Sequence, residues 1–447
     1  MEGKVNNYKF PNQKEYEPHQ LLNAGQIMTI IMRMIYKSNN SVGLDCCRTA
    51  YVAMELTKQI DWDDRINLQN VILLSILKAA GFYHFDAECH VDISTLSSVQ
   101  LKERYTYSYV YIKNLTPIGN LAQTLLFYNT KYNSGIAQRI VQMEYASIVF
   151  AAERIVQMLK ETNFNYSSSD FNRFGLQNFN QKYIETFKAL DYNHIISDAL
   201  KPKKKSDGSV YYECFEYLEK LFKKFEYSEE ETNQFFKLMI VMLDFKSTVT
   251  VWHTIHTASY AVSLGKYYGC DADEINKLFT AGVLHDLGKI MIPRAILEFP
   301  GKLSRWEYKV VQKHVEYTYE LIGDVVPKEI CNMAVRHHER LNGLGYPLGL
   351  SAKNLTKLDR IIEVADVLSA LVDRRSYKLG FDENEVLKIF SQMVEKGELD
   401  GSITKFVTDC FELLQVSRDR YSSLLILPIG TVVMEYQEEM DATEEAV

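Results

Sequence analysis

Apolar residues recur three and four positions apart along most of this chain, and this spacing constrains the fold more than any other feature. Between Leu21 and Ile35 they follow one face of an α-helix. Six further stretches predict helices in the same way: 49–60, 68–82, 211–226, 229–246, 251–268 and 271–286. Because only 21 Gly and 9 Pro interrupt the 447 residues, we predict an all-α fold.

Two parts of the chain depart from the helical pattern. Residues 200–209 combine Pro, Gly and four closely spaced Lys without an apolar face, which is typical of a solvated loop. The short apolar stretch 424–434 contains Pro and Gly, and we predict a small C-terminal β-hairpin there, within 421–447, before an acidic tail. No apolar run approaches the ~20 residues that a membrane-spanning helix needs.

Charge and cysteine usage exclude several classes of protein. With 50 basic and 58 acidic residues, the formal charge is −8, which argues against binding to nucleic acid polymers or anionic membranes. A small anionic ligand stays compatible with this charge if a local site is positive. The seven Cys are scattered and no signal peptide precedes them, so we predict a cytoplasmic protein with reduced thiols.

The second half of the chain weakly repeats the first. Three segments align in the same order: 47–58 with 255–266, 76–81 with 283–288, and 148–153 with 361–366. The offset between them drifts slowly, from 207–208 to 213 residues. Chance matching among Ala- and Leu-rich helices is the alternative explanation, but three ordered segments favour a duplicated helical domain.

Histidine gathers in the second half, where six of the ten His fall between residues 253 and 338. Imidazole and carboxylate ligands suit Fe, Mn, Co, Ni or Zn, and no Cys belongs to the set. An adjacent His-Asp or His-His pair is weak by itself, because exposed dipeptides of this kind are common. The combination predicts a metal site from these residues: His253, His285, Asp286, His314, His337, His338 and Asp366.

The order of motifs around these residues resembles the HD-GYP family, the branch of the HD metal-dependent phosphohydrolases that cleaves cyclic di-GMP. The resemblance covers residues 250–400 in detail, and the first half resembles a degenerate copy of the same domain. The matching motifs are His285-Asp286-Leu-Gly-Lys289, Ile292-Pro293, Pro300-Gly301-Lys302-Leu303, His337-His338-Glu-Arg-Leu-Asn-Gly343-Leu-Gly345-Tyr346-Pro347, Val364-Ala365-Asp366-Val367 and Arg375-Ser-Tyr377-Lys378.

The resemblance implies tandem HD-type helical domains with a di-metal site in the second. One ion would take His253, His285, Asp286 and Asp366; the other would take Asp286, His314, His337 and His338, with Asp286 as the bridge. Some relatives hold a third ion through a Glu four residues before the first His. Val249 stands at that position and cannot bind metal, so we expect two divalent ions. Fe or Mn is the first choice for them, and Zn, Ni or Co are the alternatives. His256 stands where the family usually has Arg, and we expect it to support the site without binding metal.

Two cations about 3.5–4 Å apart lower the pKa of a shared water toward 7, and the hydroxide can attack a phosphodiester in line. We predict Asp286 and Lys289 as catalytic residues, with Lys289 also on the phosphate. The resemblance adds Tyr346, Arg375 and Lys378 as substrate-binding residues. Tyr346 could instead be a packing residue, and Ser376 replaces the family's Pro, which weakens the assignments around it.

The first half has lost the ligand positions. Asp45 or Cys46 stands near the place of His253, Lys78-Ala79 replaces His-Asp, and Glu153 replaces Asp366. A lone Lys cannot do the chemistry of an ion, so we predict neither metal nor hydrolysis there. A structural role, a homodimer surface or a regulatory pocket remain as alternatives.

These interpretations combine into one prediction for the whole chain. We expect a degenerate domain over 1–165, a helical connector over 166–245, an active domain over 246–420 and the hairpin and tail over 421–447. The predicted function is a phosphodiesterase of bacterial signalling that hydrolyses cyclic di-GMP to pGpG, or further to GMP. The alternatives are a hydrolase of a cyclic GMP-AMP dinucleotide or a nucleotide monoester, and a low-turnover adaptor that binds other cyclic di-GMP signalling proteins.

Overall fold

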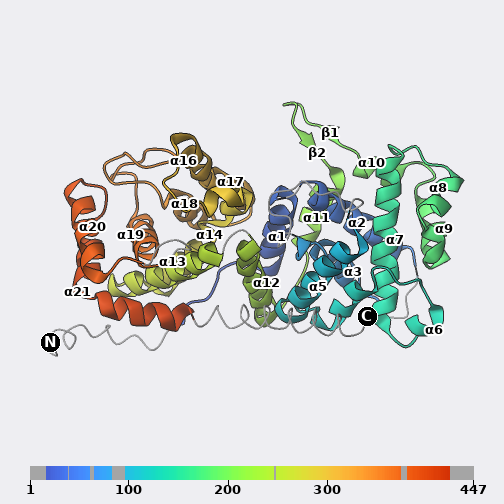
Figure 1. The fold of residues 1–447 in the computed structure, drawn as a ribbon, viewed down its shortest axis with the longest axis horizontal. Helices are drawn as coiled ribbons and strands as arrows, with labels where there is room; N and C mark the ends of the chain where they lie inside the picture. The colour runs from blue at the N-terminus through green and yellow to red at the C-terminus, as the bar shows by residue number, and fades with distance from the viewer. Residues whose placement is uncertain are drawn as a thin grey trace. The chain divides into compact units, whose positions relative to one another are not determined.

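The computed structural model describes residues 17–38, 40–60, 65–82, 96–245, 248–373 and 380–422 (Figure 1). The described chain is helical almost throughout, which confirms the all-α prediction. One antiparallel pair, β1 (Lys203–Lys204) and β2 (Val210–Tyr211), falls in and beside the stretch expected to be a loop. The predicted hairpin, from residue 423 onward, lies outside the described residues. None of the described helices combines the length and the apolar character needed to span a bilayer.

The described residues form two compact units. Residues 24–238 form one unit, and residues 17–23 with 239–422 form the other. The finer division into four predicted segments stays a proposal.

The first unit is built around α2, which packs against α3 and α7. Seven consecutive residues of α3, 71–77, are buried, so this helix lies in the core. The helices up to the unit boundary are α1 (Ala24–Ser38), α2 (Asn40–Lys58), α3 (Leu68–Leu77), α5 (Ser98–Leu115), η3 (Gly119–Phe127), α6 (Ser134–Ala137), α7 (Val141–Glu161), α8 (Ser168–Arg173), η4 (Leu176–Asn178), α9 (Gln181–Leu190), α10 (Ile195–Leu200), α11 (Glu213–Phe222) and α12 (Glu229–Val241).

The second unit is built around α13, which packs against α14 and α19 (lime to orange in Figure 1). Gly282 allows the close approach of α14, because a Cβ there would lie 2.7 Å from the Cα of Ala258. The helices up to residue 409 are η5 (Met242–Phe245), α13 (Thr248–Tyr267), α14 (Ala272–Leu284), η6 (Leu287–Met291), α15 (Arg294–Leu297), α16 (Arg305–Gln312), α17 (His314–Ile322), α18 (Lys328–Arg336), α19 (Lys357–Val372), α20 (Glu383–Glu395) and α21 (Gly401–Asp409). Residues 411–422 are helical as well.

Local sequence signals explain where several of these helices begin. Ser304 and Glu307 form a capping box that starts α16, and their three-residue spacing is the sequence signal for it. A Thr356–Asp359 box starts α19 in the same way. Such boxes satisfy two of the amide N–H groups that a helix start leaves unpaired.

Candidate metal centre

The His285-Asp286 pair lies where one helix ends and another begins. His285 is the C-cap of α14 and Asp286 is the N-cap of η6, and both side chains are fully buried. Two residues later, a Cβ on Gly288 would lie 2.0 Å from the carbonyl oxygen of His314. Glycine is therefore needed for η6 to pack against α17, and this contact brings His314 to the pair.

All seven predicted ligands meet at this point of the second unit. Asp286 faces two groups of imidazoles with its two oxygens: Oδ2 lies 3.2 Å from His285 Nε2 and 3.6 Å from His253 Nε2. Oδ1 lies 3.4 Å from His314 Nε2 and 3.9 Å from His337 Nε2. The carboxylate therefore stands between two sets of nitrogen atoms.

Asp366, on α19, closes the arrangement from the other side. Its Oδ1 lies 3.0 Å from His253 Nε2 and 3.7 Å from His285 Nε2, while its Oδ2 lies 3.6 Å from His338 Nδ1. Helix α19 thus supplies a second carboxylate to the nitrogen atoms that face Asp286 Oδ2.

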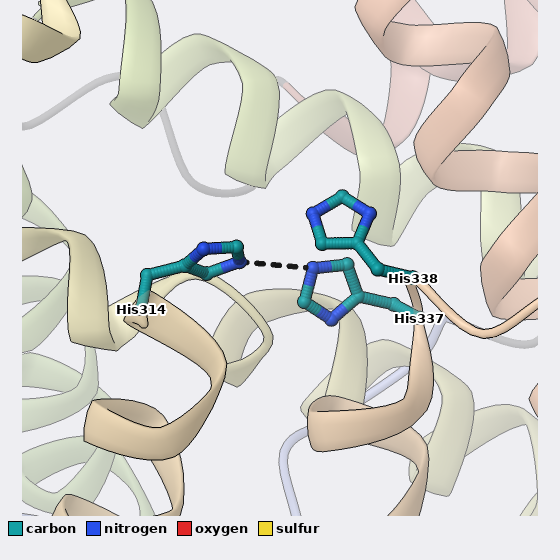
Figure 2. Close-up of side chains that lie close together, drawn as sticks. All are labelled: His314, His337 and His338. Carbon is teal, nitrogen blue, oxygen red and sulfur yellow. Dashed lines mark hydrogen bonds between the residues drawn. The ribbon is translucent and has the colours of Figure 1, made fainter. Parts of the chain in front are cut away.

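Backbone carbonyls set the orientation of three of the imidazoles. The Nδ1–H groups of His285, His314 and His337 each donate to the carbonyl three residues earlier at 2.6 Å. Each Nε2 is then left with its lone pair toward the centre of the site. Figure 2 shows His314 and His337 facing each other with His338 beside them. The Nε2 atoms of His314 and His337 are 3.3 Å apart.

Burial keeps most of these imidazoles neutral, which is the form that binds metal. It lowers the pKa of His314 to about 4 and that of His337 to about 3. Burial also lowers the pKa of His253, but the neighbouring carboxylates of Asp366 and Asp373 outweigh it and raise this pKa to about 9. Metal binding at His253 would therefore release a proton. Burial alone would raise the pKa of Asp286, but His285 and Lys289 hold it well below its usual value.

The donor set fits divalent cations. Two buried atoms, His285 Nε2 and Asp286 Oδ1, have no hydrogen-bond partner, and unpaired buried polar atoms of this kind are rare unless they serve a function. Ligands about 2.1 Å from one ion lie about 3–3.5 Å from each other, as several of these atoms do. Two sets could each hold an ion: His253, His285 and Asp286, and His314, His337 and His338.

A cavity of about 510 Å³ opens onto this cluster, within the range of small-molecule sites. His253, His314, His338 and Asp366 form part of its wall. Lys289 lines it too, with its Nζ 2.5 Å from Asp286 Oδ2. The predicted phosphate contact therefore lies beside the carboxylate that faces both sets.

Tyr346 also lines the cavity, and its ring packs on His338 with 4.7 Å between the ring centroids. Its loop is held by Glu339, whose carboxylate accepts the backbone N–H groups of Leu348 and Leu350 at 2.7 Å each. Gly345 has no room for a side chain, because a Cβ would lie 2.4 Å from the backbone nitrogen of Arg340. Tyr346 thus packs on the cluster and also lines the cavity, so its position is compatible with either of the two sequence interpretations.

Two predicted substrate-binding residues, Arg375 and Lys378, lie outside the described residues. The structure adds wall residues that sequence reasoning missed: Phe299, Tyr308, Arg340 and Asp373. Arg340 directly follows the His337-His338-Glu motif, which is the signal that could have identified it. Asp373 lies seven residues after Asp366, two helical turns along and on the same face, and this spacing was the signal for it.

Comparisons with known proteins agree with this geometry. Residues 237–403 match the family described as HD domain. The chain is 27% identical, over 83% of its length and 88% of the relative, to the 3′3′-cGAMP-specific phosphodiesterase 1 of Vibrio cholerae. It is 29% identical to a cyclic di-GMP phosphodiesterase of Thermotoga maritima, over 44% of this chain and 58% of that relative.

A crystal structure shares the fold. It is that of V-cGAP3, a cyclic GMP-AMP specific phosphodiesterase of V. cholerae, with a TM-score of 0.55 and 18% identity. The match covers 89% of this chain and 98% of that chain. The similarity therefore spans both units and is not restricted to the metal centre.

Proposed function

Since residues 237–403 match the family described as HD domain, we propose that this chain is a metal-dependent phosphodiesterase that hydrolyses cyclic dinucleotides. The observation that carries the proposal is the shared position of Asp286. One buried carboxylate turns one oxygen toward each of two sets of ligands, and it contacts Lys289, which lines the cavity.

Each side chain then has a distinct task. The first ion would be held by His253, His285, Asp286 and Asp366, and the second by Asp286, His314, His337 and His338. When bound, such ions act as Lewis acids and lower the pKa of water, which supplies a nucleophile at neutral pH. The backbone-anchored imidazoles keep their lone pairs on the site at no further reorganisation.

Lys289 binds the phosphate in this proposal. Its side chain is 18% exposed and its ammonium lies between Asp286 and the cavity, so it can donate to a non-bridging oxygen as negative charge develops there. Tyr346 lines the same wall and offers an aromatic face to a purine base. Arg375 and Lys378 are proposed for the second phosphate or a guanine.

Cyclic di-GMP is the first proposed substrate, with pGpG and then GMP as products. The alternative substrate is 3′3′-cGAMP, because the V. cholerae relative that aligns over most of both chains is specific for it. The two differ only in one purine base, so the choice depends on the cavity wall and not on the metal cluster.

A substrate panel tests both levels of the proposal. The purified full chain, loaded with Mn²⁺ or Fe²⁺, is incubated with equal concentrations of cyclic di-GMP, 3′3′-cGAMP and a nucleotide monoester, and products are separated by chromatography. We expect cleavage of a cyclic dinucleotide by the wild type and none by Asp286→Ala. Equal activity of the two proteins contradicts the proposed site, and no cleavage despite two bound ions supports an adaptor instead.

A further inference from the structure

His253 is anchored differently from the other imidazoles that direct Nε2 into the site. His285, His314 and His337 each rest on a carbonyl of their own chain segment. His253 lies within α13, and its Nδ1 instead lies 2.9 Å from Ser369 Oγ on α19. Its orientation therefore depends on side chains of another helix.

The anchor continues past Ser369 to a carboxylate. Ser369 Oγ donates to Asp373 Oδ2 at 2.7 Å, and the same Oδ2 lies 3.8 Å from His253 Nδ1. The carbonyl oxygen of His253 is a more distant acceptor for the same hydroxyl, at 3.2 Å. Since a hydroxyl has one proton and Asp373 is the nearer acceptor, Ser369 donates to Asp373 and accepts the Nδ1–H of His253. The other oxygen of Asp373 lies 2.5 Å from His256 Nδ1.

This chain of contacts has a chemical consequence at the metal-facing nitrogen. A carboxylate behind a ligating imidazole fixes its tautomer and its ring orientation and makes it a better donor. In this structure, a hydroxyl connects the two groups. Only 8% of the Asp373 side chain is exposed, and His256 holds its second oxygen in place.

We propose that Asp373 is a positioning residue for the first metal ion, acting on His253 through the hydroxyl of Ser369. The inference rests on the proposed metal centre. It gives His256 a role as well, because an imidazole at that position holds the outer oxygen of Asp373 while the inner oxygen serves Ser369.

The other ion provides an internal reference. Its proposed ligands His314 and His337 have carbonyl anchors and no contact with Asp373. Loss of the Asp373 carboxylate should therefore weaken one of the two metal sites and leave the other unchanged.

The test is a titration of the metal-free full chain with Mn²⁺, followed by calorimetry and by electron paramagnetic resonance of the free ion. For Asp373→Asn, which keeps size and removes charge, we expect about 10–100-fold weaker binding of one ion and an unchanged second. Asp382→Asn is the matched control: Asp382 caps α20 in the same unit, Asn is an equally good cap, and both affinities should equal those of the wild type.

A second variant separates positioning from folding. Ser369→Ala keeps the Asp373–His256 pair and removes only the connection to His253, so the same ion should bind more weakly than in the wild type. If Asp373→Asn and Ser369→Ala both bind two ions with wild-type affinities, the inference is overturned while the proposed function stands. If the wild type binds no Mn²⁺, both are overturned.

Discussion

The two units have similar helix arrangements, but a predicted metal ligand in the second unit corresponds to a buried lysine in the first. In the second unit, α13 packs against α14 and α19, and His285 follows α14. In the first, α2 packs against α3 and α7, and Lys78 follows α3 as its C-cap. Lys78 is 1% exposed and its ammonium contacts Glu153 on α7, the position that aligns with Asp366.

A second pair of positions shows the same replacement. Asp45 is one of the two residues, with Cys46, that stand near the place of His253. Lys160 aligns with Asp373 at the offset of the last repeat segment. Asp45 and Lys160 form a direct ion pair, whereas His253 and Asp373 are connected through the hydroxyl of Ser369. Where the first unit lacks the predicted metal ligands, ion pairs of its own lysines therefore connect the helices.

The largest expected effect concerns the buried ion pair of Lys78 and Glu153 in the first unit. Glu153→Leu leaves the buried ammonium without a carboxylate, and we expect a loss of about 3–5 kcal/mol in the free energy of unfolding. Urea denaturation measures the loss, and hydrogen exchange should place it in α3 and α7. The turnover of the second unit should change little.

The double variant Lys78→Met/Glu153→Leu is the control for that experiment. Well-packed apolar residues often replace a buried ion pair without cost, so most of the lost stability should return. A double variant as unstable as the single one would show that the ion pair is not what Glu153 contributes.

Lys78 and Lys289 should have different roles, the first in stability and the second in catalysis. Lys289 faces a cavity and a proposed phosphate, so Lys289→Ala should lower kcat about 10²–10³-fold while two Mn²⁺ ions still bind. Lys289→Arg should recover part of the rate, since the charge remains. Unchanged kcat in Lys289→Ala would remove this residue from the proposed reaction.

Removal of the bound metal by a chelator should destabilise the second unit only, because the first unit has no predicted metal ligands. A ligand present at 100 times its Kd stabilises the folded state by about 2.7 kcal/mol. Removing metal should therefore abolish activity and raise hydrogen exchange in α13, α14 and α18, with α3 and α7 unaffected. Equal responses in both units would contradict the proposed division of roles.

Much of this arrangement was predictable from the sequence because its signals are local or ordered. Helical spacing and the capping box at Ser304 depend on neighbouring residues, and the His and Asp motifs keep a fixed order. The anchoring of His253 by Ser369 and Asp373 was not predictable, because it joins residues 116 positions apart through a hydroxyl with no motif of its own. The packing of Gly288 on His314 likewise depends on a tertiary contact.

In the metal-free chain, acid should lower the stability of the second unit more than that of the first, and this is the smallest of the expected effects. Burial lowers the pKa of His314 to about 4 and that of His337 to about 3, against about 6.5 when unfolded. Between these values the unfolded chain binds more protons, so stability is present above pH 6.5 and is lost as the pH falls toward 4. Each imidazole contributes at most about 1.4 kcal/mol per pH unit in this window. Hydrogen exchange at pH 7 and 5 should therefore increase in α17 and α18 more than in α3 and α7, and a uniform increase would refute the argument.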